Sequence, residues 1–333
     1  MVCAYVCATL QNLTSMALAS LLIGIFTFVQ LNCENLFDCQ HDSLKNDVEY
    51  TPDGNRRWTK ARYWNKVNTI AKTLVSCGDD GRLPDLMALC EVENDSVMRD
   101  LTKRSPLKGG CYDYFMTNSN DPRGIDVALV YCRLTFRPLE TKSLRPQGDF
   151  KDHQPRDVLY VKGIKQGGDT LHVMVVHAPS RIGGKEASTP RRMAVAKTIT
   201  STIDSISRYD AKAKIIVTGD FNANADEMPL KELEKHGMTN ISSGHKGENG
   251  AEGSYKYQGS WEYIDHVLVS QSLYDRRPAC RLHDRKWLLE EDKRYGGIKP
   301  RRTFYGWRYD KHGCSDHLPL VVTLRGKTDK GIK

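Results

Sequence analysis

The sequence predicts an α/β protein built from layers of sheet and helix. Short apolar runs of strand-like character alternate along the chain with longer segments whose apolar residues recur every three or four positions. The 333 residues contain no internal repeat, low-complexity tract or long linker, and this length suits one large domain with a sizeable core. Hydrophobic residues make up 39% and charged residues 27%, which excludes collagen, coiled coil, extended disorder and a polytopic membrane protein. We expect one domain over residues 25–325.

The predicted strands are short runs rich in valine, isoleucine and leucine. The first is Phe26–Leu31, whose residues alternate as those of a strand do. Six more are predicted, at Asp85–Glu91, Asp126–Tyr131, Leu171–His177, Lys214–Gly219, Ile264–Val269 and Leu318–Leu324. Helical spacing occurs at Tyr63–Val75 and at Arg191–Ile206. Glycine pairs such as Gly183-Gly184 mark turns between these elements.

Residues 1–24 are predicted to be an apolar leader. The chain has no Lys or Arg before Lys45, and Leu13–Val29 is strongly apolar. This stretch resembles the apolar part of a secretory signal, but the positive segment that should precede it is absent and no clear cleavage site follows. Three interpretations stay open. The segment is a signal-like leader, which favours a secreted or cell-envelope location, or a membrane anchor, or a gene-model extension with Met16 as the true start. Residues 326–333 form a short Lys-rich tail.

Ten cysteines are spread along the chain without any CxxC pair, at positions 3, 7, 33, 39, 77, 90, 111, 132, 280 and 314. This spacing argues against a zinc ribbon and a thioredoxin-type redox motif. Their density is also far below that of a small disulfide-stabilised secreted protein. We expect buried or inert thiols, with one or two disulfides left open.

Polar residues gather where the apolar strands begin or end. Each taken alone also fits a surface carboxylate, an Asx turn or a satisfied buried histidine. Together they bring carboxylates, amides and two histidines, and oxygen ligands of this kind suit a hard divalent cation. A zinc site would need more His or Cys at ligand spacing. The residues in question are Asn32, Glu34, Glu91, His177, Asp220, Asn222, Asp316 and His317.

Six short motifs together resemble the endonuclease/exonuclease/phosphatase superfamily. They are Asn32-Cys-Glu34, Leu89-Cys-Glu91, His177-Ala-Pro-Ser, Gly219-Asp-Phe-Asn222, Tyr263-Ile-Asp-His266 and Ser315-Asp-His317. The resemblance covers about 300 of the 333 residues. It implies a four-layer α/β sandwich, in which two packed mixed β-sheets are flanked by helices. It also implies a metal-dependent phosphoesterase, since the superfamily includes DNase-like nucleases, abasic-site endonucleases, inositol-polyphosphate phosphatases and neutral sphingomyelinases.

The resemblance further assigns a metal site. Glu91 resembles the principal carboxylate ligand of Mg²⁺, with Mn²⁺ as the alternative ion. Asn32 and Glu34 resemble the residues that support it, and Asp316 stands where the family has a second carboxylate near the metal.

The same resemblance assigns the catalytic roles. Asp220 resembles the residue that orients or deprotonates the attacking water, and Asn222 the amide that holds a phosphate oxygen. His317 resembles the imidazole that contacts the phosphoryl group, with Asp265 fixing its tautomer and favouring its charged form. His177 lies where DNase-like members place a second histidine.

Basic residues indicate an anionic substrate. The formal net charge is +8, and the segment 276–311 holds 12 Lys and Arg against 5 Asp and Glu. This segment is predicted to form a polyanion-binding rim. Arg123, Arg301 and Arg302 are candidate substrate-binding residues, although each also fits an ordinary surface arginine.

Nucleic acid or another phosphorylated polyanion is therefore the expected substrate of a monomeric endonuclease or exonuclease. The alternative is a phosphatase or phospholipid phosphodiesterase of the inositol phosphate or sphingomyelin type. A binding protein without activity would have lost a main carboxylate or histidine, and the sequence has lost none.

Overall fold

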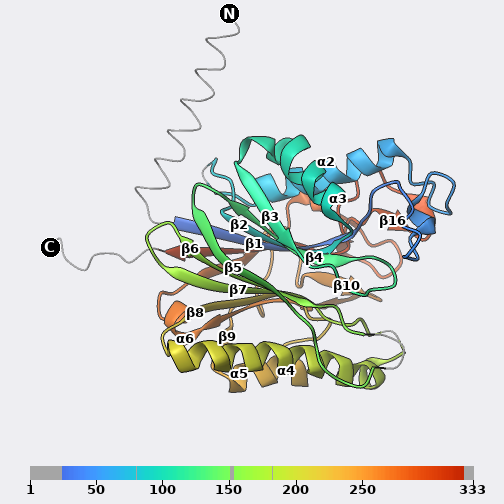
Figure 1. The fold of residues 1–333 in the computed structure, drawn as a ribbon. Coiled ribbons are helices and arrows are strands. Elements are labelled where there is room, and N and C mark those ends of the chain that lie inside the picture. The colour runs from blue at the N-terminus through green and yellow to red at the C-terminus, as the bar shows by residue number, and fades with distance from the viewer. Residues whose placement is uncertain (1–24, 80, 151–153, 182, 326–333) are drawn as a thin grey trace, which may run out of the picture.

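Two six-stranded β-sheets pack face to face and carry helices on their outer faces (Figure 1). The computed structural model describes residues 25–79, 81–150, 154–181 and 183–325. The predicted leader over 1–24 and the tail over 326–333 lie outside these described residues. Within the described part, no helix has the length and apolar character needed to cross a membrane. The order helix–sheet–sheet–helix confirms the predicted four-layer sandwich.

The first sheet has the strand order β13-β18-β1-β2-β4-β3. Its strands are β1 (Ile25–Leu36), β2 (Leu86–Val92), β3 (Tyr112–Met116), β4 (Asp126–Cys132), β13 (Ala279–Leu282) and β18 (Leu320–Arg325). β1 and β2 are parallel, and the other neighbours are antiparallel. We expected Asn32 and Glu34 to close β1, but the strand continues to Leu36, because a change of register after Asn32 lets pairing with β2 resume.

The second sheet repeats this plan with the order β5-β6-β7-β8-β12-β9. Its strands are β5 (Phe136–Leu144), β6 (Val158–Lys165), β7 (Thr170–His177), β8 (Lys214–Asp220), β9 (Met238–Asn240) and β12 (Asp265–Ser270). Here β7 and β8 form the parallel pair, and the other neighbours are antiparallel.

The helices cover the two outer faces. α2 (Lys60–Ser76) and α3 (Asp95–Arg99) lie over the first sheet, while α4 (Lys185–Tyr209) and α5 (Met228–Lys235) lie over the second (Figure 1). The Thr59 side chain caps α2 by accepting a hydrogen bond from the backbone N–H of Arg62. α6 (Gln271–Tyr274) leads from β12 towards β13. The shorter turns are η1 (Val48–Tyr50), η2 (Asp100–Arg104), η3 (Pro106–Gly109) and η4 (Lys286–Leu288).

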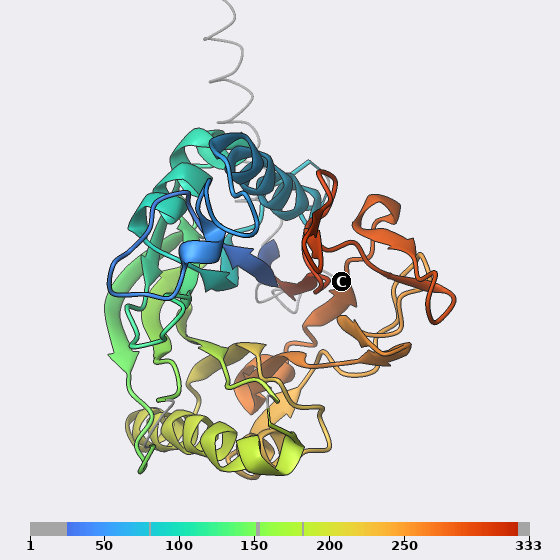
Figure 2. The same ribbon diagram turned by 90° about the vertical axis from the view of Figure 1, so that its right-hand side faces the viewer.

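Three small antiparallel hairpins lie in the last quarter of the chain, in the part coloured orange to red in Figure 2. They pair β10 (Tyr255–Tyr257) with β11 (Ser260–Glu262), β14 (Leu289–Glu291) with β15 (Ile298–Pro300), and β16 (Phe304–Tyr305) with β17 (Arg308–Tyr309). Two of them belong to the basic segment 276–311.

Strand alternation divides the apolar residues between two cores. Val175 on β7, Ile216 on β8 and Val267 on β12 join the large core between the sheets. Their neighbours Val217 and Leu268 point the other way and pack beneath α4 and α5. This two-residue period fixes which side chains reach the space between the sheets.

The eight described cysteines are free thiols, and no disulfide joins them. Cys33, Cys77, Cys90 and Cys314 are buried, which agrees with the expectation of buried or inert thiols for these four.

Candidate active site

The inner faces of four strands change from apolar to polar at one end of the sandwich. Every second side chain of these strands faces the space between the sheets. At this end of the sandwich the inward-facing residues are Asn32 on β1, His177 on β7, Asp220 on β8 and Asp265 on β12. In the sheet register Asp220 is the partner of both His177 and Asp265, so these three lie side by side. All four residues are buried. Four of the predicted residues are therefore brought together by the strands themselves.

Asn32 joins the two sheets at this end. Its Nδ2 donates to Asp220 Oδ2 at 3.0 Å and lies 3.2 Å from Glu91 Oε1. Its Oδ1 accepts from the backbone N–H of Glu34 at 2.9 Å. Asn32 thereby holds one carboxylate from each sheet at a fixed separation.

The backbone around these residues is strained. Glu34, Asn35, Glu91 and Asn222 have φ of 50°, 55°, 59° and 49°, a region that residues other than glycine rarely adopt. Each such residue costs of the order of 1–3 kcal/mol, and such strain clusters at functional sites. At Glu91 the strain accompanies a register shift in β2, and the side chain then accepts a hydrogen bond from the backbone N–H of Asn35 at 2.9 Å.

His317 and Asp265 form a buried hydrogen-bonded pair. His317 Nδ1 lies 2.7 Å from Asp265 Oδ2, and Gln30 Nε2 donates to the other Asp265 oxygen at 2.8 Å. Burial disfavours the charged imidazolium, but the nearby carboxylates, Asp265 above all, outweigh it and hold the pKa of His317 well above its usual range. In return, despite burial, the charge and hydrogen bond of His317 lower the pKa of Asp265. The opposite ring nitrogen of His317 lies 4.0 Å from Asp220 Oδ2.

Asp220 is a buried carboxyl group with a raised pKa. Burial raises its pKa to about 7, although the charge of His317 works in the opposite direction. Its Oδ1 accepts from the backbone N–H of Asn222 at 2.8 Å, and the Asn222 side chain donates to the Ala178 carbonyl at 3.1 Å. Asn222 is thus held beside Asp220.

His177 approaches the same carboxylates from β7. Its Nε2 lies 3.6 Å from Asp220 Oδ2 and 3.7 Å from Glu91 Oε1, and its Nδ1 has no hydrogen-bond partner among the described residues. Burial, followed by the charges of Arg156 and Arg123, lowers its pKa well below the usual range. This shift favours the neutral imidazole.

Glu34 and Asp316 lie on either side of Arg302. Arg302 Nε donates to Glu34 Oε1 at 2.9 Å, and its Nη2 lies 3.0 Å from Asp316 Oδ2. Arg301, by contrast, pairs with Asp310 at 2.8 Å. The two neighbouring arginines that were predicted together therefore have different partners.

Arg123 lines a cavity of about 290 Å³ with Arg156, Arg191 and Asp121. Arg156 Nη1 donates to the backbone carbonyl of His177 at 3.2 Å, and its Nη2 lies 2.9 Å from Asp121 Oδ2. Through Arg156 the cavity therefore lies next to the backbone of His177, and its lining carries more positive than negative charge.

Sequence reasoning missed three residues of this region: Gln30, Arg156 and Arg191. Gln30 had a usable signal, because it occupies the inward-facing position two residues before Asn32. Arg156 and Arg191 had none, since their proximity depends on how the two segments fold together.

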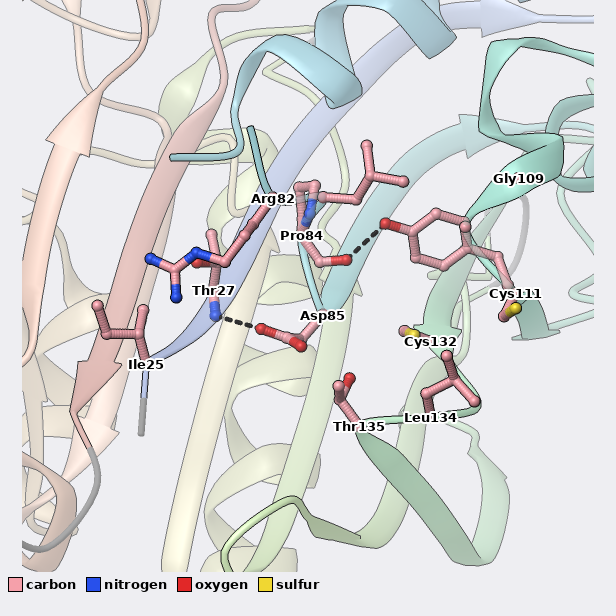
Figure 3. Close-up of a pocket in the computed structure, with 13 residues that line it drawn as sticks. Ile25, Thr27, Arg82, Pro84, Asp85, Gly109, Cys111, Cys132, Leu134 and Thr135 are labelled. Carbon is pink, nitrogen blue, oxygen red and sulfur yellow. Dashed lines mark hydrogen bonds between the residues drawn. The ribbon is translucent and has the colours of Figure 1, made fainter. Parts of the chain in front are cut away.

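A second cavity, of about 110 Å³, lies at the opposite end of β1 and β2 (Figure 3). Thr27 on β1 donates its backbone N–H to Asp85 at 2.7 Å, and the Tyr112 hydroxyl donates to the Pro84 carbonyl at 2.6 Å. Among the described residues, Asp85 is the only carboxylate that lines it. None of the predicted site residues lines this cavity, so it is separate from the candidate active site.

The buried residues Asp220, Asp265 and His317 bring ligand atoms within 4.8 Å of one another, close enough to hold one metal ion. Glu91 is the better place, because Asp265 and His317 are already hydrogen-bonded to each other at 2.7 Å, whereas the Glu91 carboxylate accepts hydrogen bonds only from the Asn32 amide and the Asn35 backbone in the described structure. Oxygen donors of this kind fit a hard divalent cation.

Comparisons with known proteins identify the family and the fold. The model of the Endonuclease/Exonuclease/phosphatase family matches residues 27–326. No curated protein matches the chain. Many solved structures share the fold, among them a family protein from Bacteroides thetaiotaomicron with 15% identity and a TM-score of 0.58, which covers 93% of this chain and 98% of that one.

Two other matching structures carry more specific names. A mannosyl-6-phosphatase from Bacteroides thetaiotaomicron has 18% identity and a TM-score of 0.57, and covers 89% of this chain and 98% of its own. Truncated Caenorhabditis elegans TDP2 has 14% identity and a TM-score of 0.55, and the match covers 91% of this chain and 98% of that one. At these identities the likeness concerns the fold. The match of the family model over most of the chain shows that this protein belongs to the endonuclease/exonuclease/phosphatase family.

Proposed function

We propose that the protein is a divalent-metal-dependent phosphodiesterase that hydrolyses nucleic acid. The observation that carries this proposal is the buried His317–Asp265 pair facing Asp220, with Glu91 and Asn32 beside them. A phosphodiester is anionic and resists attack, so its hydrolysis needs charge neutralisation, an aimed water and proton transfer. The cluster offers a group for each of these needs.

Within this proposal Asp220 orients the attacking water and accepts its proton. Positioned proton transfer of this kind contributes roughly 10²–10⁴-fold. His317, kept protonated by Asp265, stabilises the charge that develops on the phosphoryl oxygens, and the Asn222 amide donates to one of them. Removing one such fixed donor costs about 3 kcal/mol of transition-state stabilisation.

Glu91 and Asn32 are the residues that we expect to hold Mg²⁺, with Mn²⁺ as a substitute. The Glu91 carboxylate contacts only neutral hydrogen-bond donors, so its negative charge remains available to a cation. A divalent ion held by these residues would supply Lewis acidity to the phosphoryl oxygens.

The arginine cavity supports a substrate with more than one phosphate. Arg156 is fixed by Asp121 and His177, and Arg191 forms no ion pair with any described residue. A second phosphate of the same strand, next to the one being cleaved, fits this position. Exposed basic residues of segment 276–311, such as Arg277, Lys293 and Arg308, add to the positive surface.

A phosphomonoesterase is the second candidate, and the match with a mannosyl-6-phosphatase favours it. Such an enzyme would need only one phosphate site. The phospholipid phosphodiesterase alternative depends on the apolar segment 1–24, which lies outside the described residues.

A panel of substrates tests the ranking. The full chain with Mg²⁺ is incubated with single-stranded DNA, plasmid DNA, RNA, mannose 6-phosphate, inositol phosphates and sphingomyelin. We expect cleavage of a nucleic acid that is lost in Asp220→Asn and kept in the control Asp226→Asn, whose side chain is exposed in a nearby turn. Turnover of mannose 6-phosphate or inositol phosphate without nuclease activity would reverse the order of the two candidates.

A further inference from the structure

A group of four charged residues lies beside Glu91 and is already balanced. It consists of the carboxylates Glu34 and Asp316 and the cations Arg302 and Lys66. Two of these residues, Glu34 and Asp316, were predicted to bind the metal, so their actual partners decide how many ions the site can hold. Any role of the group in metal binding rests on the proposed function, because it concerns the metal of that same site.

Both oxygens of Glu34 are engaged within the protein. Oε1 accepts from Arg302 Nε at 2.9 Å, while Oε2 accepts from the backbone N–H of Thr303 at 2.7 Å and lies 3.6 Å from Lys66 Nζ. Glu34 is 6% exposed. A metal ion at this carboxylate would have to share its oxygens with the Arg302 guanidinium, and the Lys66 ammonium would repel it.

Lys66 is a fixed internal cation. It projects from α2, is 1% exposed, and donates to Thr303 Oγ1 at 2.6 Å and to the backbone carbonyl of Cys314. These contacts join α2 to the segment that carries Arg302 and the Ser315-to-His317 motif. Burying a lysine is costly unless its charge is compensated, and Glu34 provides that compensation.

Arg302 links the two carboxylates through a planar group with several donors. One edge reaches Glu34, and Nη2 reaches Asp316 at 3.0 Å. Two negative charges thus meet two positive charges, which leaves no net charge to attract a divalent cation. Glu91 differs, because its hydrogen-bond donors are neutral.

We infer that Arg302 is a built-in cation at the active site, and that the protein binds one divalent ion, at Glu91, with no second ion at Glu34 and Asp316. The Arg302 side chain is 41% exposed, so part of the guanidinium remains accessible to an anionic substrate. A fixed arginine there can donate hydrogen bonds to an anionic substrate without depending on metal concentration.

Counting bound Mn²⁺ tests this inference. The number of ions bound per full chain is measured by isothermal titration calorimetry and by the electron paramagnetic resonance signal of free Mn²⁺. We expect one ion for the wild type. Arg302→Met removes the cation and frees two carboxylates, so a second ion should bind. Arg302→Lys keeps a cation and should bind one.

Arg301→Met is the matched control, because Arg301 is the adjacent arginine but pairs with Asp310. It should bind one ion, as the wild type does. Two ions in the wild type, or one ion in a folded Arg302→Met, would overturn the inference. If Arg302→Met does not fold, the number of Mn²⁺ ions bound by the wild type still tests the inference.

The outcome can be separated from that of the proposed function. Two bound ions together with intact hydrolysis contradict only the role of Arg302. A Glu91→Gln variant that binds Mn²⁺ as the wild type does would contradict the metal site on which the proposed function depends.

Discussion

At the scale of single residues, the site is defined by which donors each carboxylate already has. Asp265 is saturated by His317 and Gln30, and Glu34 by Arg302, Thr303 and Lys66. Glu91 and Asp220 differ because the hydrogen-bond donors to them are neutral, namely the Asn32 amide and backbone N–H groups. Residues with the same charge can thus have different roles, because a low-dielectric interior strengthens the electrostatic interaction of each carboxylate with its neighbours.

Replacing His317 should greatly reduce activity without unfolding the protein. His317→Ala removes the imidazolium that faces Asp220, and we expect kcat to fall roughly 10²–10³-fold with a smaller effect on KM. His312→Ala is the control, since that histidine is exposed five positions earlier. Circular dichroism checks the fold. A His317→Ala enzyme with near wild-type kcat at saturating Mg²⁺ would remove His317 from the proposed mechanism.

The sequence predicted which residue types form the site, but it did not predict the backbone geometry that positions them. Motifs and strand ends pointed to Asp220, Asp265 and His317, which the fold brings together. That Glu91 turns into the site through a positive φ is a property of the register shift in β2. The link between Arg302 and Glu34 spans 268 positions along the chain, so no local pattern could have indicated it.

At the scale of elements, the predicted strands are all central ones, and none of the edge strands was predicted. β2, β7 and β8, for example, are buried on both faces and read as continuous apolar runs. The central strand β6 was missed as well, because Lys162 and Gly163 interrupt its apolar run. β5 and β9 are edge strands. β5 has a mostly exposed pattern, and β9 has only three residues, so neither produces such a run. α4 begins at Lys185, ahead of the predicted Arg191, and it keeps Pro190 inside its first turns.

The start of α4 supplies Arg191 to the cavity beside His177, and this placement is testable. Arg191→Ala should raise KM for an oligonucleotide and lower the slope of log affinity against log salt by about 1, because one phosphate contact is lost. Arg208→Ala, an exposed arginine near the other end of α4, should change neither quantity. An unchanged salt slope in Arg191→Ala would contradict the proposed second phosphate position.

At the scale of the whole molecule, ion pairs connect parts of the chain that are distant in sequence. Asp169 lies in the turn between β6 and β7 of the second sheet, whereas Arg276 leads into β13 at the edge of the first. Arg276 donates to Asp169 through both terminal nitrogens, one of them at 3.2 Å, and Lys165 and Lys214 lie 3.4 and 3.3 Å from the same carboxylate. This cluster ties the two layers together at the start of the basic segment.

The Asp169 cluster should make stability depend on pH in the acid range. Burial alone would raise the pKa of Asp169, but the pairing with Arg276 outweighs it and lowers the pKa to about 2, from 3.8. A carboxyl group with a lowered pKa in the folded state stabilises that state fully above the unfolded value. The contribution is therefore lost as the pH falls from about 4 to about 2.

We expect Asp169→Asn to lower the free energy of unfolding by about 1–2 kcal/mol at pH 7 and pH 5. The difference from wild type should shrink at pH 3 and nearly vanish towards pH 2, where Asp169 becomes protonated in both states. Urea titrations at these pH values measure it, with Asp53→Asn as the control because that side chain is exposed. A deficit that stays constant from pH 7 to pH 2 would mean that the carboxylate charge does not hold the two sheets together, and that the substitution acts through packing instead.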